Sequence, residues 1–298
     1  MKHLSHYTNP AGLRGIATSG TFWATNFLTV EDRSELFYGW RIVQLAALRY
    51  VRERLPADVF ADIVDPSGDQ LEELFRAELN GSAGYGHLYM SSFIRHETDD
   101  DEERGSLTHW RHFAGNGTGY CLQYDPADIE RMIQMEGWKS TYGLLDLAPV
   151  TYGVDETTWE FRQLVQQLGE LQLLAILKQT RDPRIPVNHG VHWAPSAVAR
   201  KLMRFCATHK DPIFRDEREV RILAFPEDQT VVRPFTGLAV AKTIEPIGDR
   251  RIIALGSNWT PGISPKRIIV GPRAERDIAD SVTRFEHRPE IVISRIPI

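Results

Sequence analysis

The sequence has few cysteines, no long apolar run and no excess of basic residues, and each shortage excludes a class of protein. Two cysteines, Cys121 and Cys206, occur among 298 residues, so the chain lacks the disulfide framework on which many secreted domains depend. No apolar stretch approaches the ~20 residues that a membrane-spanning helix needs, and no early run resembles a signal peptide. These shortages predict a soluble, cytoplasmic protein with no membrane partner.

The charge balance argues against a general affinity for nucleic acid. Thirty-five basic and forty acidic residues give a formal charge of −5, whereas proteins that neutralise phosphates usually carry a basic stripe. A local basic patch at residues 200–204 leaves specific contacts with nucleic acid open. The length allows one large domain or two modest ones and is ample for a well-buried core, and no internal repeat or low-complexity linker divides the chain.

Helix and strand signals are unevenly distributed along the chain. The first helix is marked by Asn9 as its N-cap, Pro10 in its first turn and Gly20 at its end. Further helices are expected at residues 32–54, 70–79, 107–114, 156–179, 196–209 and 275–285, and from 126 onward. Strands are expected at residues 6–8, 21–25, 87–93, 120–124, 150–153, 217–225, 231–235, 251–255, 267–270 and 291–296. The acidic run 99–103 is expected to be a solvated loop or a helix start. Helices dominate the first two thirds and strands the last third, which predicts an α+β fold.

The most informative segment is the charged start of the strand expected at residues 217–225. Side chains alternate along a strand, so Glu217, Glu219 and Arg221 are expected on one face. Two carboxylates beside an arginine suit a cleft that holds a cationic or sugar-like transition state. A surface strand with a charged solvent face explains the same pattern, and both interpretations stay open.

Two other strands carry candidate binding residues. In His6-Tyr7-Thr8, the histidine suits a ribose hydroxyl and the tyrosine suits a planar ring. Ser91 and Ser92 place adjacent hydroxyls on a later strand. Packing and capping roles are the commoner explanation of each motif alone.

Two further patterns do not amount to sites. His109 and His112 lie three residues apart on an expected helix, but no organised set of further ligands accompanies them, so no metal site is predicted. The glycine-rich stretch 115–119 lacks the lysine and the following helix of a phosphate-binding loop.

Taken in order, these segments resemble a bacterial domain-of-unknown-function family, number 2971. The matching segments are spread over almost the whole chain: His6-Tyr7-Thr8, residues 13–16, Phe22-Trp23-Ala24-Thr25, Ser91-Ser92-Phe93, Trp110 with Phe113-Ala114, residues 117–121, Val150-Thr151-Tyr152, residues 210–221 with their Glu-x-Glu-x-Arg, and residues 266–272. Each segment is weak alone, and the ordered set is fairly specific.

The layout of that family is similar to the ADP-ribosyltransferase superfamily. The resemblance implies an ADP-ribosyltransferase-like split mixed β-sheet core with surrounding helices. It implies one domain over residues 1–298, with helical insertions around 32–80 and 156–209. Glu219 would be the catalytic carboxylate, and Glu217 would orient or deprotonate the acceptor. NAD would be bound by His6, Tyr7, Thr8, Ser91, Ser92, Trp110 and Arg221, with Tyr7 or Trp110 stacking on a base.

Three functions follow as hypotheses. The first is an NAD-dependent enzyme that cleaves the nicotinamide–ribose bond and transfers ADP-ribose to a protein, a nucleic acid or water, in stress or phage defence. The alternative is a non-catalytic ligand-binding or interaction module on the same fold. The third, a nuclease or metal-dependent hydrolase, predicts that a chelator abolishes activity, whereas the first predicts no metal requirement.

Overall fold

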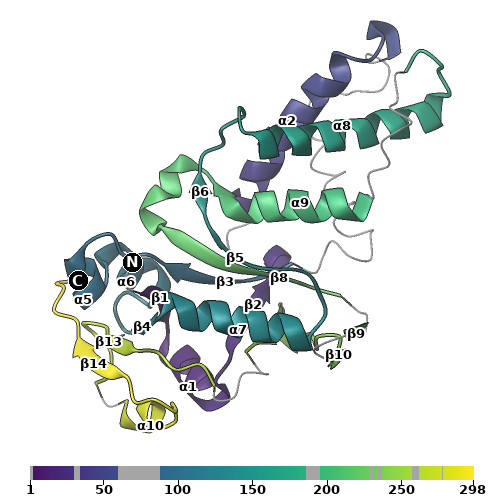
Figure 1. Ribbon diagram of the computed structural model, residues 1–298. Helices are drawn as coiled ribbons and strands as arrows, with labels where there is room; N and C mark the ends of the chain where they lie inside the picture. The colour runs from purple at the N-terminus through teal and green to yellow at the C-terminus, as the bar shows by residue number, and fades with distance from the viewer. Residues whose placement is uncertain are drawn as a thin grey trace. The chain divides into compact units, whose positions relative to one another are not determined.

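The chain divides into two compact units, each assembled from separate segments (Figure 1). The computed structural model describes residues 3–29, 34–59, 88–185, 195–227, 231–233, 237–256, 262–276 and 278–298. The sheet unit comprises Met1–Val30, Leu88–Val150 and Ile213–Ile298, and the helical unit comprises Glu31–His87 and Thr151–Pro212. The helical unit contains the two regions in which we expected helical insertions. A single domain over the whole chain stays a prediction.

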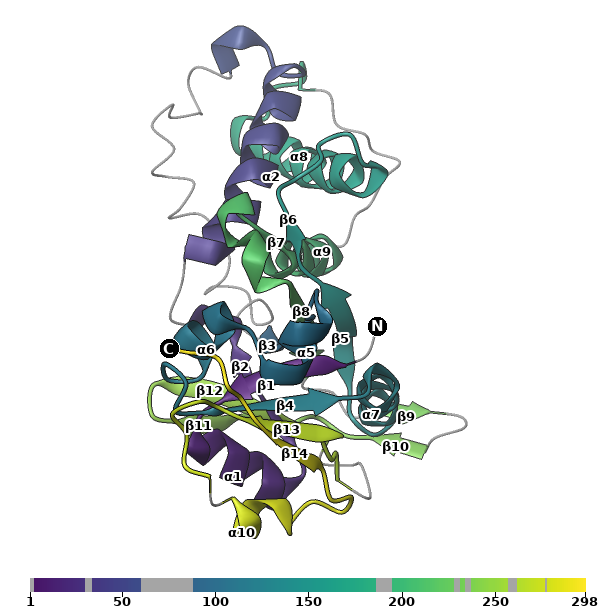
Figure 2. The same ribbon diagram turned by 90° about the vertical axis from the view of Figure 1, so that its left-hand side faces the viewer.

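A ten-stranded sheet forms the centre of the sheet unit (Figure 2). The strand order along its main path is β11-β12-β2-β3-β1-β4-β13-β14, and β8 and β5 branch from β3. All pairings are antiparallel except that of β13 with β14. The strands are β1 Leu4–Thr8, β2 Phe22–Asn26, β3 Tyr89–Ile94, β4 Tyr120–Tyr124, β5 Tyr142–Pro149, β8 Glu219–Pro226, β11 Glu245–Ile247, β12 Arg250–Leu255, β13 Arg267–Val270 and β14 Glu290–Ile293. The protein is therefore α+β with a mixed, mostly antiparallel sheet.

Strand β3 is the point at which this sheet splits. One edge of β3 pairs with β8 along its whole length, from Tyr89 to Ile94. The other edge is shared, because β2 pairs only with Tyr89 and Met90 and β1 pairs only with Ile94. Among the described strands, none pairs with this edge between those ends. We call the resulting opening between β1 and β2, beside residues 91–93, the fork.

The two faces of the sheet are covered by different helices. One face, the core face, packs against residues of three helices: α1 Pro10–Ser19, α7 Pro126–Lys139 and α10 Ala279–Val282. Its buried side chains include Phe22, Phe93, Leu122, Tyr124 and Ile222. On the opposite face, Trp110 of helix α6 (Leu107–Phe113) packs in a smaller cluster with Tyr7.

The described part of the helical unit contains three helices and a short parallel strand pair. The elements are α2 Ser34–Arg52, α8 Trp159–Thr180, α9 Pro195–Thr208, β6 Thr151–Tyr152 and β7 His209–Lys210. Helices α2 and α8 approach closely at Gly169, where a Cβ atom would collide with the ring of Tyr50. Val51, Leu173 and Ile176 are among the buried residues at their contact. No helix among the described residues is long and apolar enough to cross a membrane.

Several predicted elements are confirmed. Asn9 accepts a hydrogen bond from the backbone N–H of Gly12 at 2.8 Å, so it caps α1, and Gly20 ends that helix with a φ of 64°. Strands β4 and β13 have the predicted bounds. The acidic run starts helix α5 (Asp99–Arg104), which Thr98 caps.

Other predictions are wrong or incomplete. Strand β5 was not expected, because Gly143, Asp146 and Pro149 interrupt any apolar alternation. Strands β10 Gly237–Ala239 and β11 were also missed. The helix expected at 275–285 is reduced to the short α10. The helix expected at 70–79 lies outside the described residues.

Candidate functional site

The fork places three side chains predicted for the site on one face of the sheet. Ser92 and Arg221 are Cα partners on β3 and β8, and Ile94 and Glu219 form the next pair on this face. Because side chains alternate along strands, Ser92, Glu219 and Arg221 share the face opposite the core face. Ser91 points to the core face and is 5% exposed. The structure therefore places the two serines expected at the site on opposite faces of β3.

Glu219 and Arg221 form a buried, two-point ion pair. The Arg221 Nε donates to Glu219 Oε1 at 2.7 Å and its Nη2 donates to Oε2 at 2.8 Å. The side chains are 8% and 2% exposed, respectively. This bidentate geometry, with two parallel hydrogen bonds, is stronger than a single hydrogen bond between an arginine and a carboxylate. The pair therefore holds an ionised carboxylate at the start of β8.

His6 closes the fork from β1. Its Nδ1 lies 2.9 Å from the carbonyl oxygen of Ser92. A carbonyl only accepts, so Nδ1 carries the proton and Nε2 is an acceptor in the neutral ring. Burial lowers the pKa of His6, although the hydrogen bond to Ser92 opposes this shift. His6 is the Cα partner of Leu122 and packs against the rings of Phe22 and Phe93, so its neutral ring lies on the core face, opposite the face that carries Glu219 and Arg221.

Tyr7 lies on the opposite face of β1 from His6, the face that carries Glu219, and packs there among aromatic rings. Its ring stacks on His109 at 5.4 Å and meets the edge of Trp110 at 5.0 Å. Tyr7 is 7% exposed and Trp110 is fully buried. The predicted stacking of either ring on NAD stays a prediction, and this packing argues against it.

The hydroxyl of Tyr7 belongs to a network that the sequence did not indicate. It accepts from the backbone N–H of Ser106 at 2.9 Å and therefore donates its own proton to His96 Nε2, also at 2.9 Å. His3 Nδ1 lies 2.6 Å from Glu102. Burial opposes ionisation of Glu102, but hydrogen bonds from His96 and His3 keep its pKa below the usual value. These bonds fasten residues 96–106 to β1 across about 90 positions of sequence, a distance that no local pattern reveals.

Glu217 does not share a strand face with Glu219, so that prediction is wrong. Residues Pro212–Glu217 form a 3-10 turn, and β8 begins only at Glu219. Between them, Arg218 has a left-handed φ of 48°, which breaks the alternation of the strand. The carbonyl of Glu217 instead accepts from His109 Nε2 at 3.1 Å. Its role toward an acceptor stays a prediction.

Thr8 also lies away from the fork. It ends β1 opposite Tyr120, and a Cβ atom at Gly12 would collide with the Thr8 hydroxyl. The side chain therefore packs against the first turn of α1. Its expected contact with NAD remains a prediction.

Burial of His109 predicts a loss of stability in mild acid. Burial lowers the pKa of His109 to about 4, against 6.5 in an unfolded chain, although the bond to Glu217 opposes this shift. The unfolded state then binds the proton first, so the contribution of His109 is complete above about pH 6.5 and is lost between pH 6.5 and about pH 4. The free energy of unfolding should fall by about 2 kcal/mol from pH 7 to pH 5 on this account.

Urea titrations at the two pH values measure this effect. His109→Phe should be less stable at pH 7 but should lose less on acidification than the unsubstituted protein. His112→Phe, an exposed position on the same helix, is the matched control and should keep the full pH dependence. Equal pH dependence in His109→Phe and the control would contradict the assignment.

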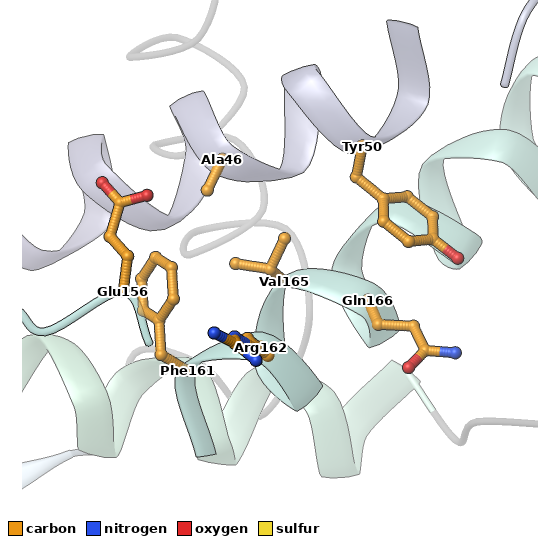
Figure 3. A pocket seen from close by; sticks show the side chains of 7 residues that line it. All are labelled: Ala46, Tyr50, Glu156, Phe161, Arg162, Val165 and Gln166. Atoms are coloured by element: carbon orange, nitrogen blue, oxygen red, sulfur yellow. The ribbon is translucent and has the colours of Figure 1, made fainter. Parts of the chain in front are cut away.

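The helical unit contains a pocket of its own, of about 350 Å³ (Figure 3). Figure 3 shows Ala46 and Tyr50 of α2 facing Phe161, Val165 and other residues of α8. The described residues that line it include no member of the predicted site. The pocket therefore gives no support to the site expected from the sequence.

The comparison with protein families gives one match, over part of the chain. A family model described as a protein of unknown function (DUF2971) matches residues 109–222. The matched region contains Trp110 and all of the Glu-x-Glu-x-Arg segment, whereas β1 and β3 lie before it. The match supports the resemblance to that family. No curated protein and no solved structure matches the chain.

Proposed function

We propose that the protein is an NAD-dependent ADP-ribosyltransferase-like enzyme that cleaves the nicotinamide–ribose bond. The observation that carries the proposal is the buried carboxylate of Glu219, which is fixed by Arg221. Arg221 is the Cα partner of Ser92 at the fork, and Glu219 belongs to the next residue pair on the same face. A buried, ionised carboxylate on the same face as a partly exposed serine is a suitable place for a reaction that develops positive charge. An ADP-ribosyltransferase-like split sheet is the architecture that this proposal assigns to the fork.

The reaction places specific demands on these residues. The bond between the nicotinamide nitrogen and ribose C1′ breaks, and its electron pair leaves with nicotinamide. The electron-poor C1′ then takes a lone pair from the acceptor or from water, and the acceptor's proton passes to a base or to solvent. Glu219 would stabilise the positive charge on the sugar and accept from a ribose hydroxyl, while Arg221 fixes its orientation.

The remaining residues of the fork have simpler roles in this proposal. The hydroxyl of Ser92 would support the nicotinamide end. The expected contact of His6 with a ribose hydroxyl stays a prediction, and the place of His6 on the core face, opposite Glu219, argues against it. The proposed acceptor is a macromolecule or water, in stress or phage defence. Glu217 lies on the turn before β8. Its proposed role, deprotonating that acceptor, would therefore be performed from the turn and not from the strand face that carries Glu219.

A non-catalytic module is the second candidate, and the same ion pair gives it support. Both oxygens of Glu219 accept from Arg221, which a purely structural pair would also require. The two candidates differ in whether the protein consumes NAD.

The proposal is tested by incubating the purified protein with NAD and separating the products by chromatography. We expect nicotinamide to accumulate with ADP-ribose, free or attached to added cellular protein or nucleic acid, at a rate that a chelator leaves unchanged. Binding of NAD without nicotinamide release would favour the non-catalytic module. Activity that disappears on chelation would favour the metal-dependent hydrolase and contradict the proposal.

A further inference from the structure

An exposed tryptophan stands beside the fork on the face that carries Glu219. Thr25 of β2 is the Cα partner of Met90 on β3, so Trp23, two residues earlier, points to the same face at the level of Ser92. Strands β2 and β3 no longer pair at that level. Trp23 therefore lies at the edge of the fork formed by β2. Tyr7 lies on the same face of the sheet, on β1 at the other edge of the fork.

The indole of Trp23 is 52% exposed, although its neighbours on β2 are well buried. Phe22 and Ala24 point to the core face and are at most 1% exposed, so they anchor the strand without help from Trp23. Its Cα partner on β12 is Ala254, whose methyl group is too small to cover a large ring. The indole of Trp23 therefore offers an open aromatic surface on the face that carries Glu219 and Arg221.

We propose that Trp23 is the stacking surface for the nicotinamide ring of NAD, an inference that rests on the proposed function. Tyr7 and Trp110, the rings expected to stack, are buried against each other, whereas Trp23 presents an open aromatic surface near Ser92. The nicotinamide ring of NAD is planar and positively charged, and indole is the best aromatic partner for such a cation. This placement puts nicotinamide at the β2 side of the fork and the ribose toward β8.

The charge of the ring determines which kinetic quantity should change. As the bond to ribose breaks, positive charge moves from the ring to the sugar, so stacking on Trp23 favours bound NAD more than the transition state. Removing the indole should therefore weaken NAD binding and raise KM, with kcat unchanged or raised. Loss of a stacked base generally weakens binding roughly 10- to 100-fold.

Calorimetric titration of Trp23→Ala and Trp23→Phe with NAD and with ADP-ribose tests the inference. ADP-ribose lacks the nicotinamide ring, so Trp23→Ala should lose roughly 10- to 100-fold in affinity for NAD and none for ADP-ribose. Trp23→Phe should recover part of the loss. The matched control is Trp138→Ala, which removes an indole 49% exposed on helix α7 of the same unit and should bind both ligands normally.

Two outcomes would overturn this role for Trp23. One is unchanged NAD affinity in Trp23→Ala, and the other is an equal loss for NAD and ADP-ribose, which would place the ring elsewhere or indicate a folding defect. Either is distinct from failure of the proposed function, in which the unsubstituted protein itself neither binds NAD nor releases nicotinamide; the stacking role would then fail with it.

Discussion

Replacing Glu219 with glutamine is expected to lower the rate of nicotinamide release by about 100-fold or more, the usual effect of removing one preorganised electrostatic group from an active site. Glutamine has nearly the same shape and keeps one of the two oxygens that accept from Arg221, while its NH2 group faces the second Arg221 donor, so some stability is lost together with the charge. What it removes is the negative charge opposite the sugar. The loss should therefore appear in kcat more than in the affinity for NAD.

This comparison needs a control for the substitution itself. Glu245→Gln makes the same chemical change at an exposed position of β11 and should leave nicotinamide release unchanged. Thermal melting of both variants, with assays well below the lower melting temperature, separates lost chemistry from lost folding. Full activity in a folded Glu219→Gln variant would show that this carboxylate is not catalytic.

Arg221→Met is expected to reduce the free energy of unfolding by roughly 3–5 kcal/mol, because it leaves the Glu219 carboxylate buried without its charge partner. The double variant Arg221→Met with Glu219→Gln should be more stable than Arg221→Met alone, since no charge then stays unpaired. Urea unfolding of the two single variants and the double variant gives the coupling between the side chains.

An exposed ion pair supplies the contrast for this second prediction. Arg267 pairs with Glu290 at 2.8 Å, and the glutamate is 59% exposed. Arg267→Met should therefore cost at most about 1 kcal/mol. If Arg221→Met cost no more than Arg267→Met, or if the double variant were the least stable, the buried pair would not be the stabilising element described above.

Local signals in the sequence were sufficient for many helices and strands. Helix α1 has a capping Asn9, a first-turn Pro10 and a terminal Gly20, and each acts through backbone geometry within a few residues. The charged segment before β8 was harder to interpret. An arginine at position 218 does not predict a left-handed backbone. That conformation nevertheless places Glu217 outside the strand face.

The fork could not be predicted, because it depends on how two distant strands, β1 and β2, share one edge of β3. Ser92 meets His6 across 86 positions of sequence, and the pairing lengths of β1 and β2 decide where the edge is left open. Sequence alternation did place Glu219 and Arg221 together. It could not show that the hydroxyl of Tyr7 is hydrogen-bonded to His96 and Ser106 and its ring buried, while the ring of Trp23 is exposed.

The central claim is tested most directly by calorimetric titration of the purified protein with NAD, with nicotinamide measured in the same samples. The account predicts saturable binding of NAD, together with the release of more than one mole of nicotinamide per mole of protein. The absence of both binding and release would contradict it, and would leave the Glu219–Arg221 pair as a structural element of a protein with another ligand.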